Sequence, residues 1–258
     1  MMGELESKSE FLGRVDFHTH ILPGVDDGSR SLEGSIQMLR ALAESEVGCV
    51  ALTPHFYARR DNPERFISRR NRAMSELCEA LAAVSDMPRV HLVPGAEIEY
   101  FDGVSCLADY PELKLGKSQC LLIEMLPDIW TARMIDELIE LNGRGDCRVV
   151  IAHVERYLFN QKRGVIYELL ENGIVMQSNA EFFIDRRTSG KAIKLLRKGY
   201  IHVLGSDCHN LTDRAPNIGT ACDIIKSKLG EDMLDYMMNK AASLLARDIQ
   251  SFYDTKEG

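Results

Sequence analysis

Residues 14–20 read Arg-Val-Asp-Phe-His-Thr-His, a short apolar run that ends in two histidines. Six further runs rich in Val, Ile and Leu follow along the chain, and most lack the polar alternation of a strand with one face in water. Strands covered on both faces are typical of a parallel sheet wrapped by helices. We therefore expect seven strands, at 14–17, 48–52, 90–93, 120–123, 148–152, 174–177 and 201–204.

Amphipathic segments with the 3.6-residue period of a helix separate these runs. They cover 31–48, 63–84, 131–141, 165–172 and 189–197, and two or three more lie within 215–246. Strand and helix alternate about seven times in 258 residues, which is the size of a β/α barrel. A doubly wound open sheet is the alternative, but the glycine-rich turn that usually follows its first strand is missing. No low-complexity linker divides the chain, so we expect one domain over 1–258, with a polar leader at 1–13 and a flexible tail at 247–258.

The composition excludes several classes of function. The formal net charge is −8, whereas a nucleic-acid or anionic-membrane binder needs a dominant positive field. No apolar run approaches the roughly 18 to 20 residues of a transmembrane segment, and the first ten residues show no secretion signal. The seven cysteines are scattered and form no CxxC pair, which favours reduced thiols in a cytoplasmic protein.

Metal-ligating side chains follow six of the seven expected strands. A lone histidine is more often a structural hydrogen-bonding residue than a ligand, but five of the seven histidines lie at these strand ends: His18, His20, His55, His153 and His209. The carboxyl ends of the strands of a β/α barrel open onto one face, so residues far apart in sequence meet there. The sequence therefore predicts a cluster of imidazoles at one rim of the barrel.

Carboxylates complete the predicted cluster. With Asp27, Glu97, Glu124 and Asp207 the candidates number nine, which is too many for one ion. Mixed nitrogen and oxygen donors without thiolate suit Mn, Fe, Zn or Mg better than a cysteine-bound structural zinc.

These residues lie in motifs that resemble the PHP superfamily, and within it the bacterial manganese-dependent tyrosine-protein phosphatases of capsule and exopolysaccharide loci. The matching stretches lie at 16–31 (Asp-Phe-His-Thr-His-Ile-Leu-Pro-Gly-Val-Asp-Asp-Gly-Ser-Arg-Ser), 52–56 (Leu-Thr-Pro-His-Phe), 94–97 (Pro-Gly-Ala-Glu), 151–156 (Ile-Ala-His-Val-Glu-Arg) and 205–210 (Gly-Ser-Asp-Cys-His-Asn). The resemblance implies a distorted seven-stranded, TIM-like β/α barrel of the PHP type. It also implies a cofactor of three divalent metal ions, manganese in the first place, with Fe, Zn or Mg as alternatives.

The resemblance also implies a role for each ligand. The first ion would take His18, His20, Glu97 and Asp207. Glu97 would bridge to a second ion held with Glu124 and His153, and the third ion would take Asp27, His55 and His209. Arg156 and Arg214 resemble the family's contacts to the substrate phosphate, and Asp207 and His209 count among the catalytic residues as well as the ligands.

The chain departs from the family pattern in two places, of which the first should alter loop stiffness rather than ligation and the second concerns the substrate. The usual proline after the fifth-strand histidine is replaced by Val154, and the loop after the sixth strand reads Gln-Ser-Asn-Ala-Glu over 177–181. That loop is expected to border the substrate. The arginine-rich segment over 59–72 is either a solvated helix face or a docking strip for an acidic phosphotyrosine tail.

The leading hypothesis is a phosphotyrosyl-protein phosphatase (EC 3.1.3.48 type), in which a metal-bound hydroxide attacks phosphorus. Its partner would be a bacterial tyrosine kinase or its targets in polysaccharide synthesis, and assembly into homo-oligomers is left open. This mechanism does not require a cysteine as the nucleophile. The alternatives are a small-molecule phosphatase, such as a histidinol-phosphate phosphatase, and a non-catalytic metal-binding regulatory module.

Overall fold

The computed structural model describes residues 13–86, 89–162 and 164–246. The expected tail at 247–258 and nearly all of the leader lie outside these ranges. None of the helices within the described ranges is long and apolar enough to cross a bilayer.

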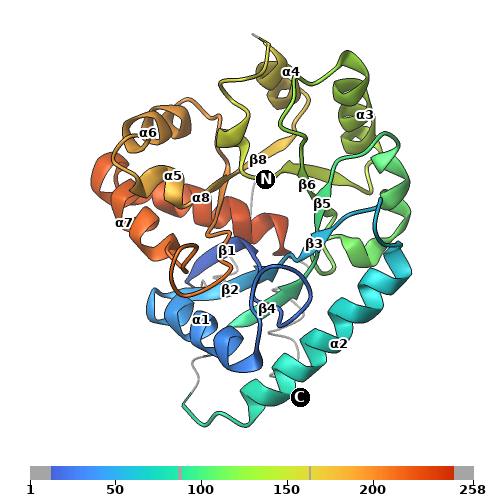
Figure 1. The fold of residues 1–258 in the computed structure, drawn as a ribbon. Coiled ribbons are helices and arrows are strands. Elements are labelled where there is room, and N and C mark those ends of the chain that lie inside the picture. The colour runs from blue at the N-terminus through green and yellow to red at the C-terminus, as the bar shows by residue number, and fades with distance from the viewer. Residues whose placement is uncertain (1–12, 87–88, 163, 247–258) are drawn as a thin grey trace, which may run out of the picture.

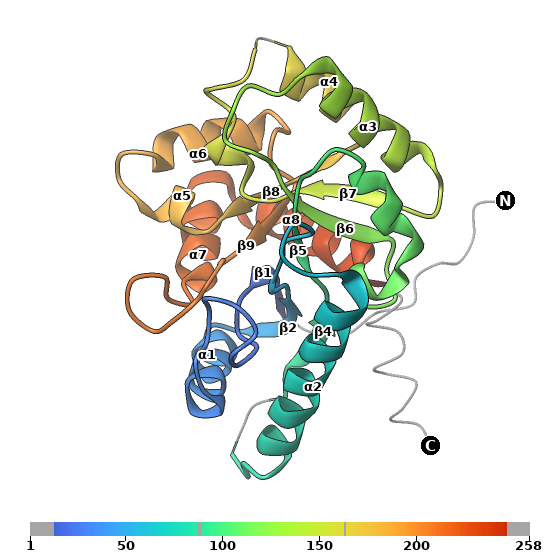
Figure 2. The same ribbon diagram turned by 45° about the vertical axis from the view of Figure 1, so that its right-hand side comes forward.

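The strands form a curled parallel sheet, as the sequence predicts (Figures 1 and 2). One three-stranded segment has the order β1-β2-β4, with bounds Arg14–Thr19, Val47–Leu52 and His91–Pro94. The other has the order β3-β5-β6-β7-β8-β9, with bounds His55–Phe56, Glu97–Glu99, Cys120–Glu124, Arg148–Ile151, Val175–Asn179 and Val203–Gly205. Every ladder is parallel, which confirms the predicted α/β barrel-like class.

Two of the seven expected strands continue beyond a short break, so residues 13–86, 89–162 and 164–246 together contain nine strands. Residues 53–54 separate β2 from β3, and residues 95–96 separate β4 from β5. Pro54 has no N–H to give to the ladder, which explains the first break. Beyond the breaks β3 pairs with β5, His55 lying opposite Glu97. The continuation therefore brings two predicted ligands onto the same edge.

The curled sheet closes between β1 and β9. Thr19 and Cys208 form an isolated parallel bridge, the N–H of Asp207 donates to the carbonyl of His18 (2.8 Å), and the N–H of His20 donates to the carbonyl of Cys208 (2.9 Å). The first and last strands thus lie side by side, although about 190 residues separate them. This closure joins the two ligand-bearing ends of the chain.

Helices cover the outside of the sheet, and several begin at the signals expected from the sequence. Ser31, Asn62 and Thr131 accept a hydrogen bond from a backbone N–H of the first turn that follows them. The long helices are α1 (Leu32–Glu44), α2 (Pro63–Ala82), α3 (Ala132–Gly143), α7 (Ile218–Leu229) and α8 (Glu231–Leu244), and the shorter ones are α4 (Val165–Glu171), α5 (Glu181–Ile184) and α6 (Ser189–Arg197).

The interior of the sheet is apolar away from the carboxyl ends of the strands. Val15, Cys49 and Val203 belong to a buried cluster that also includes Ala241 and Leu245 at the end of α8. Apolar side chains therefore fill the interior toward the amino ends of the strands, and the polar donors lie at the rim formed by the carboxyl ends.

His202 makes the stability of the fold depend on pH. It precedes β9, and its Nδ1 accepts a hydrogen bond from the N–H of Met176 (2.9 Å), which requires an unprotonated nitrogen. Burial, with a contribution from Lys240, lowers the pKa of His202 from 6.5 to about 4. Between these two values the unfolded chain binds a proton that the folded chain does not, so stability falls as the pH falls through this window.

We predict that His202→Asn, which keeps an acceptor but does not titrate, reduces this acid sensitivity. Between pH 7 and pH 4 the free energy of unfolding of the wild type should fall by about 2 kcal/mol more than that of the variant. Chemical denaturation at a series of pH values, with a chelator throughout, measures the difference. Parallel pH profiles for the two proteins would contradict the assignment.

Candidate metal centre

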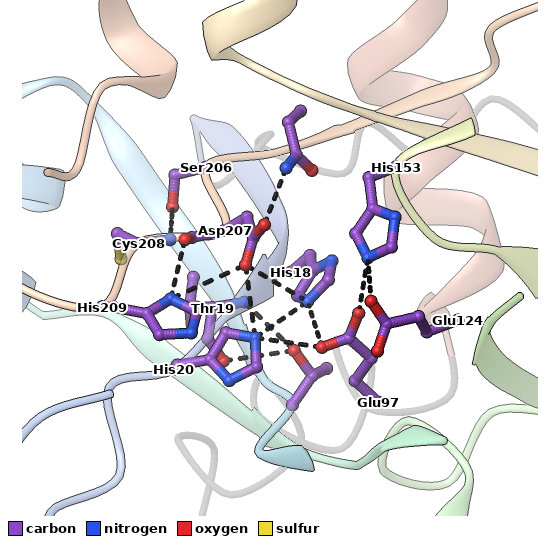
Figure 3. A network of polar contacts seen from close by, with 12 residues as sticks. His18, Thr19, His20, Glu97, Glu124, His153, Ser206, Asp207, Cys208 and His209 are labelled. Atoms are coloured by element: carbon purple, nitrogen blue, oxygen red, sulfur yellow. Dashed lines mark hydrogen bonds and ion pairs between the residues drawn. The ribbon is translucent and has the colours of Figure 1, made fainter. Parts of the chain in front are cut away.

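The structure brings all nine predicted ligands to one rim of the sheet, and Figure 3 shows most of them. Glu97 lies at the centre. Its Oε2 is 3.2 Å from the Nε2 of His18, 3.2 Å from the Nε2 of His20 and 3.0 Å from the Nδ1 of His55. Its Oε1 is 2.8 Å from the Nε2 of His153. One carboxylate therefore faces four imidazoles that come from the ends of three strands, β1, β3 and β7.

The remaining carboxylates surround this centre. The Oδ1 of Asp207 lies 3.3 Å from the Nε2 of His20, and the Oε1 of Glu124 lies 3.3 Å from the Nε2 of His153. Asp27, in the loop after β1, places its Oδ1 3.5 Å from the Nε2 of His209. The side chain of Asp27 is 66% exposed, so it marks the solvent side of the cluster.

Three groups of donor atoms are compact enough to hold a metal ion, each with all its atoms within 4.8 Å of one another. They are His18 with His20 and Asp207, His55 with Glu97 and Glu124, and His20 with Asp27, His55 and His209. His20 and His55 each belong to two groups, so the division differs in detail from the one that the family resemblance implies. His153 lies outside these three groups but contacts Glu97 and Glu124.

Hydrogen bonds orient three of the imidazoles so that Nε2 faces the cluster. The Nδ1 of His18 lies 3.2 Å from the Oε1 of Gln177, and the Nδ1 of His20 lies 2.6 Å from the Oδ2 of Asp26. The Nδ1 of His209 lies 2.9 Å from the backbone carbonyl of Asp207. With the proton held on Nδ1, the Nε2 lone pair is free to bind a metal.

Several inward-facing atoms lie close to groups of opposite charge but form no hydrogen bond of suitable geometry among the described residues. They are the Oε2 of Glu97, the Nδ1 of His55 and the Nε2 of His209, and all three are buried. A buried polar atom without a partner is costly, and its presence here calls for a ligand. The donor chemistry and these unpaired atoms both fit bound divalent cations.

The charges of the cluster are strongly coupled. Burial raises the pKa of Glu97, but His18, His153 and His20 outweigh this effect and hold the pKa well below its usual range. Burial likewise opposes protonation of His153, but hydrogen bonds with Glu124 and Glu97 raise its pKa to about 9. The buried carboxylates are stable only beside compensating positive charge. Bound metal ions would supply this charge in place of the protons on the histidines.

Comparison with known proteins identifies the fold family. The family model described as "Capsular polysaccharide synthesis, CpsB/CapC" matches residues 14–246. The chain belongs to the CpsB/CapC family. The tyrosine-protein phosphatase YwqE of Bacillus subtilis is 30% identical over 241 residues, covering 91% of this chain and 92% of YwqE. The tyrosine-protein phosphatase CpsB of Streptococcus pneumoniae is 30% identical over 232 residues, covering 84% of this chain and 91% of CpsB.

Solved structures agree with this assignment. A structure from the work on B. subtilis YwqE and S. pneumoniae CpsB, described there as metal-dependent tyrosine phosphatases, superposes with a TM-score of 0.77 at 26% identity, covering 91% of this chain and 94% of the other. The phosphotriesterase homology protein of Escherichia coli has a TM-score of 0.51 at 13% identity, covering 90% of this chain and 98% of the other, and shares the fold alone.

Two arginines lie beside the predicted ligands of this CpsB/CapC protein. Arg156 donates to the Oδ2 of Asp207 (3.0 Å) and to the Oε1 of Glu124 (3.3 Å), and Arg214 donates to the Oδ1 of Asp207 (2.7 Å). Both line a hollow of about 340 Å³, here called the arginine pocket, together with Asn179 and Thr188. The sequence-predicted phosphate contacts therefore stand where the centre opens to solvent.

Sequence reasoning missed the residues that position the ligands. Gln177 accepts a hydrogen bond from the N–H of His153 (2.7 Å) as well as contacting His18, and its Nε2 donates to Asn179 (3.0 Å). Asn179 in turn donates to the Oδ2 of Asp207 (2.7 Å). Alternation along β8 was the available signal, because Gln177 and Asn179 are two positions apart and face the same side.

Two of the three residues other than glycine that have a positive φ in the described ranges are predicted ligands. His153 and Asp207 have φ values of 32° and 54°, a left-handed conformation that residues with a side chain rarely adopt. Such strain persists where the surrounding structure enforces it, and it is common at functional sites. Each of these residues lies two positions beyond the end of a strand, His153 after β7 and Asp207 after β9.

We predict that Gly205→Ala weakens metal binding at least 10-fold. A Cβ at this position would lie 2.4 Å from the Cβ of His18 and 3.0 Å from its backbone nitrogen, so β1 and its ligands must shift. Gly143→Ala is the matched control, because a Cβ there meets nothing within 4 Å. Mn²⁺ titration of both folded variants is the measurement, and equal Mn²⁺ affinities would contradict the close-packing argument.

Proposed function

We propose that this protein is a metal-dependent tyrosine-protein phosphatase of the CpsB/YwqE type that hydrolyses phosphotyrosine in a protein substrate. The convergence of nine nitrogen and oxygen donors in a CpsB/CapC family chain carries this conclusion. The activity class follows that of YwqE and of pneumococcal CpsB. A bacterial tyrosine kinase or one of its targets in polysaccharide synthesis is the proposed substrate.

The surroundings of the centre support a protein substrate. Besides the arginine pocket, a hollow of about 530 Å³ lies beside His55 and Tyr57, and one of about 470 Å³ lies beside His209 and Asn210. An enclosed cavity would suit a small metabolite better, whereas a rim with several open hollows leaves room for a polypeptide on either side of the phosphotyrosine. We place the reaction in the cytoplasm, consistent with seven free cysteines.

The nine donors would hold three divalent ions, with manganese as the first choice and Fe, Zn or Mg as alternatives. Bound ions of this kind offset the negative charge of a phosphomonoester and lower the pKa of a coordinated water toward about 7. Glu97 lies between the groups, so its two oxygens are suited to bridging two ions. Glu124 and Asp207 flank it on opposite sides and would fix the outer ions.

Arg156 and Arg214 would bind the substrate phosphate. Their side chains are 45% and 39% exposed, and each guanidinium reaches the ligand carboxylates from the arginine pocket. A guanidinium fork matches the oxygens of a phosphoryl group and gives charge-assisted hydrogen bonds. The leaving phenolate has an ordinary pKa near 10, so it needs less proton donation than a serine alkoxide.

Removing the metal should abolish activity. We expect excess chelator to lower the rate of p-nitrophenyl phosphate hydrolysis by at least about 1,000-fold. Without bound metal ions, the side chains of the centre do not lower the pKa of the attacking water enough to form hydroxide at neutral pH. Readdition of Mn²⁺ should restore the rate, and a phosphotyrosyl peptide should be hydrolysed faster than histidinol phosphate. Full activity in chelator would refute the metal mechanism, and a preference for histidinol phosphate would favour the small-molecule alternative.

Removing either arginine should impair catalysis without removing metal. Arg156→Ala and Arg214→Ala should each lower kcat/KM for a phosphotyrosyl peptide about 10- to 100-fold, because each loses charge-assisted hydrogen bonds to the phosphate. Arg40→Ala is the control. Arg40 lies on α1 and pairs with Asp86 at 3.0 Å, away from the arginine pocket. Wild-type kcat/KM in both pocket variants would show that these arginines do not bind the phosphate.

A further inference from the structure

A second hollow, here called the lysine groove, lies outside the metal centre. It has a volume of about 450 Å³ and is bordered by α4, α6 and residues 158–162, which can be located in Figure 1. Phe159 and Tyr167 stand on its wall with exposed fractions of 60% and 57%. Four lysines line it, and the described lining residues include no carboxylate: Lys162, Lys191, Lys194 and Lys198.

The lysines of the groove lack counter-ions. None forms an ion pair with any residue in the described ranges, whereas Lys226 on α7 pairs with Glu231 at 2.6 Å. Lys191, Lys194 and Lys198 are spaced along one face of α6 and its C-terminal cap, a spacing at which like charges repel. The ammonium of Lys191 lies over the ring of Phe159, 4.8 Å from its centroid, but no carboxylate offsets the charge of these lysines. In a chain of net charge −8, positive charge without a counter-ion favours an anionic ligand.

Two stretches of chain connect the lysine groove to the arginine pocket. Arg156 lines the pocket and Phe159 lines the groove, and in a second stretch Thr188 lines the pocket and Lys191 lines the groove. Three residues span at most about 10 Å. A peptide whose phosphotyrosine occupies the centre would therefore enter the groove within a few residues.

The arginine-rich segment over 59–72 offers less free charge than the sequence suggests. Arg70 is 2% exposed and donates to the carbonyls of Gly95 and Glu112, which corrects the expectation that it belongs to a solvated face or a docking strip. Arg69 pairs with Asp61 at 2.6 Å, and Arg60 lies over the ring of Tyr57.

We propose that the lysine groove binds an acidic segment of the phosphotyrosyl protein, about three to six residues from the phosphotyrosine. The inference rests on the phosphatase activity proposed above. Carboxylates of the segment pair with the lysine ammonium groups, and its apolar side chains pack on Phe159 and Tyr167. Because the groove is remote from the reacting atoms, it acts on substrate binding and leaves the chemical step unchanged.

The test compares Lys191→Gln/Lys194→Gln/Lys198→Gln with the charge-matched control Lys226→Gln/Lys228→Gln/Lys240→Gln. The substrates are a phosphotyrosyl peptide with Asp and Glu about three to six residues from the phosphotyrosine, the same peptide with Asn and Gln at these positions, and p-nitrophenyl phosphate. We expect only the groove variant to raise KM for the acidic peptide, by about 10-fold with unchanged kcat. Added salt should raise the wild-type KM for that peptide in the same way.

Three outcomes would overturn the proposal. One is an unchanged KM for the acidic peptide in the groove variant, and another is a rise seen only in an Arg59→Gln/Arg60→Gln variant. The third is equal wild-type KM values for both peptides together with lysine-dependent binding of an acidic polysaccharide, which would assign the groove to another partner. Loss of p-nitrophenyl phosphate hydrolysis by the wild type in Mn²⁺ would instead contradict the proposed function itself.

Discussion

The buried negative charge of Glu97 is the constraint on which the rest of the structure depends. Its side chain is 1% exposed and faces imidazoles from β1, β3 and the loop after β7. A carboxylate removed from water is stable only where cations or donors compensate it. The fold therefore has to deliver positive charge to this point, from protonated histidines in the absence of metal and from divalent ions in the working enzyme.

The curled parallel sheet meets this demand because all its strands end at one rim. The breaks at residues 53–54 and 95–96 shift His55 and Glu97 onto a second segment of sheet, while the bridge between Thr19 and Cys208 closes β9 against β1. Side chains such as Gln177 and Asp26 then fix the imidazoles. A pocket in which two arginines stand among carboxylates adjoins the rim, and a groove lined by lysines without carboxylates lies outside it.

Much of this arrangement could be predicted from the sequence, because apolar runs without alternation and polar residues at their ends are local signals. The parallel sheet, the helix starts at Ser31 and Thr131 and the gathering of the nine ligands are of this kind. The strand breaks, the burial of Arg70 and the hydrogen bonds of Gln177 depend on which elements pack together, which no local pattern encodes. The lysine groove is likewise formed by two segments about 30 residues apart.

Equilibrium binding of Mn²⁺ to the wild type and to Glu97→Gln tests the central claim most directly. A shared bridging carboxylate predicts that this one substitution weakens more than one Mn²⁺ site, while circular dichroism shows a folded chain. If Glu97→Gln binds as many Mn²⁺ ions as the wild type with the same affinities, the donors do not form one metal centre and the account is wrong.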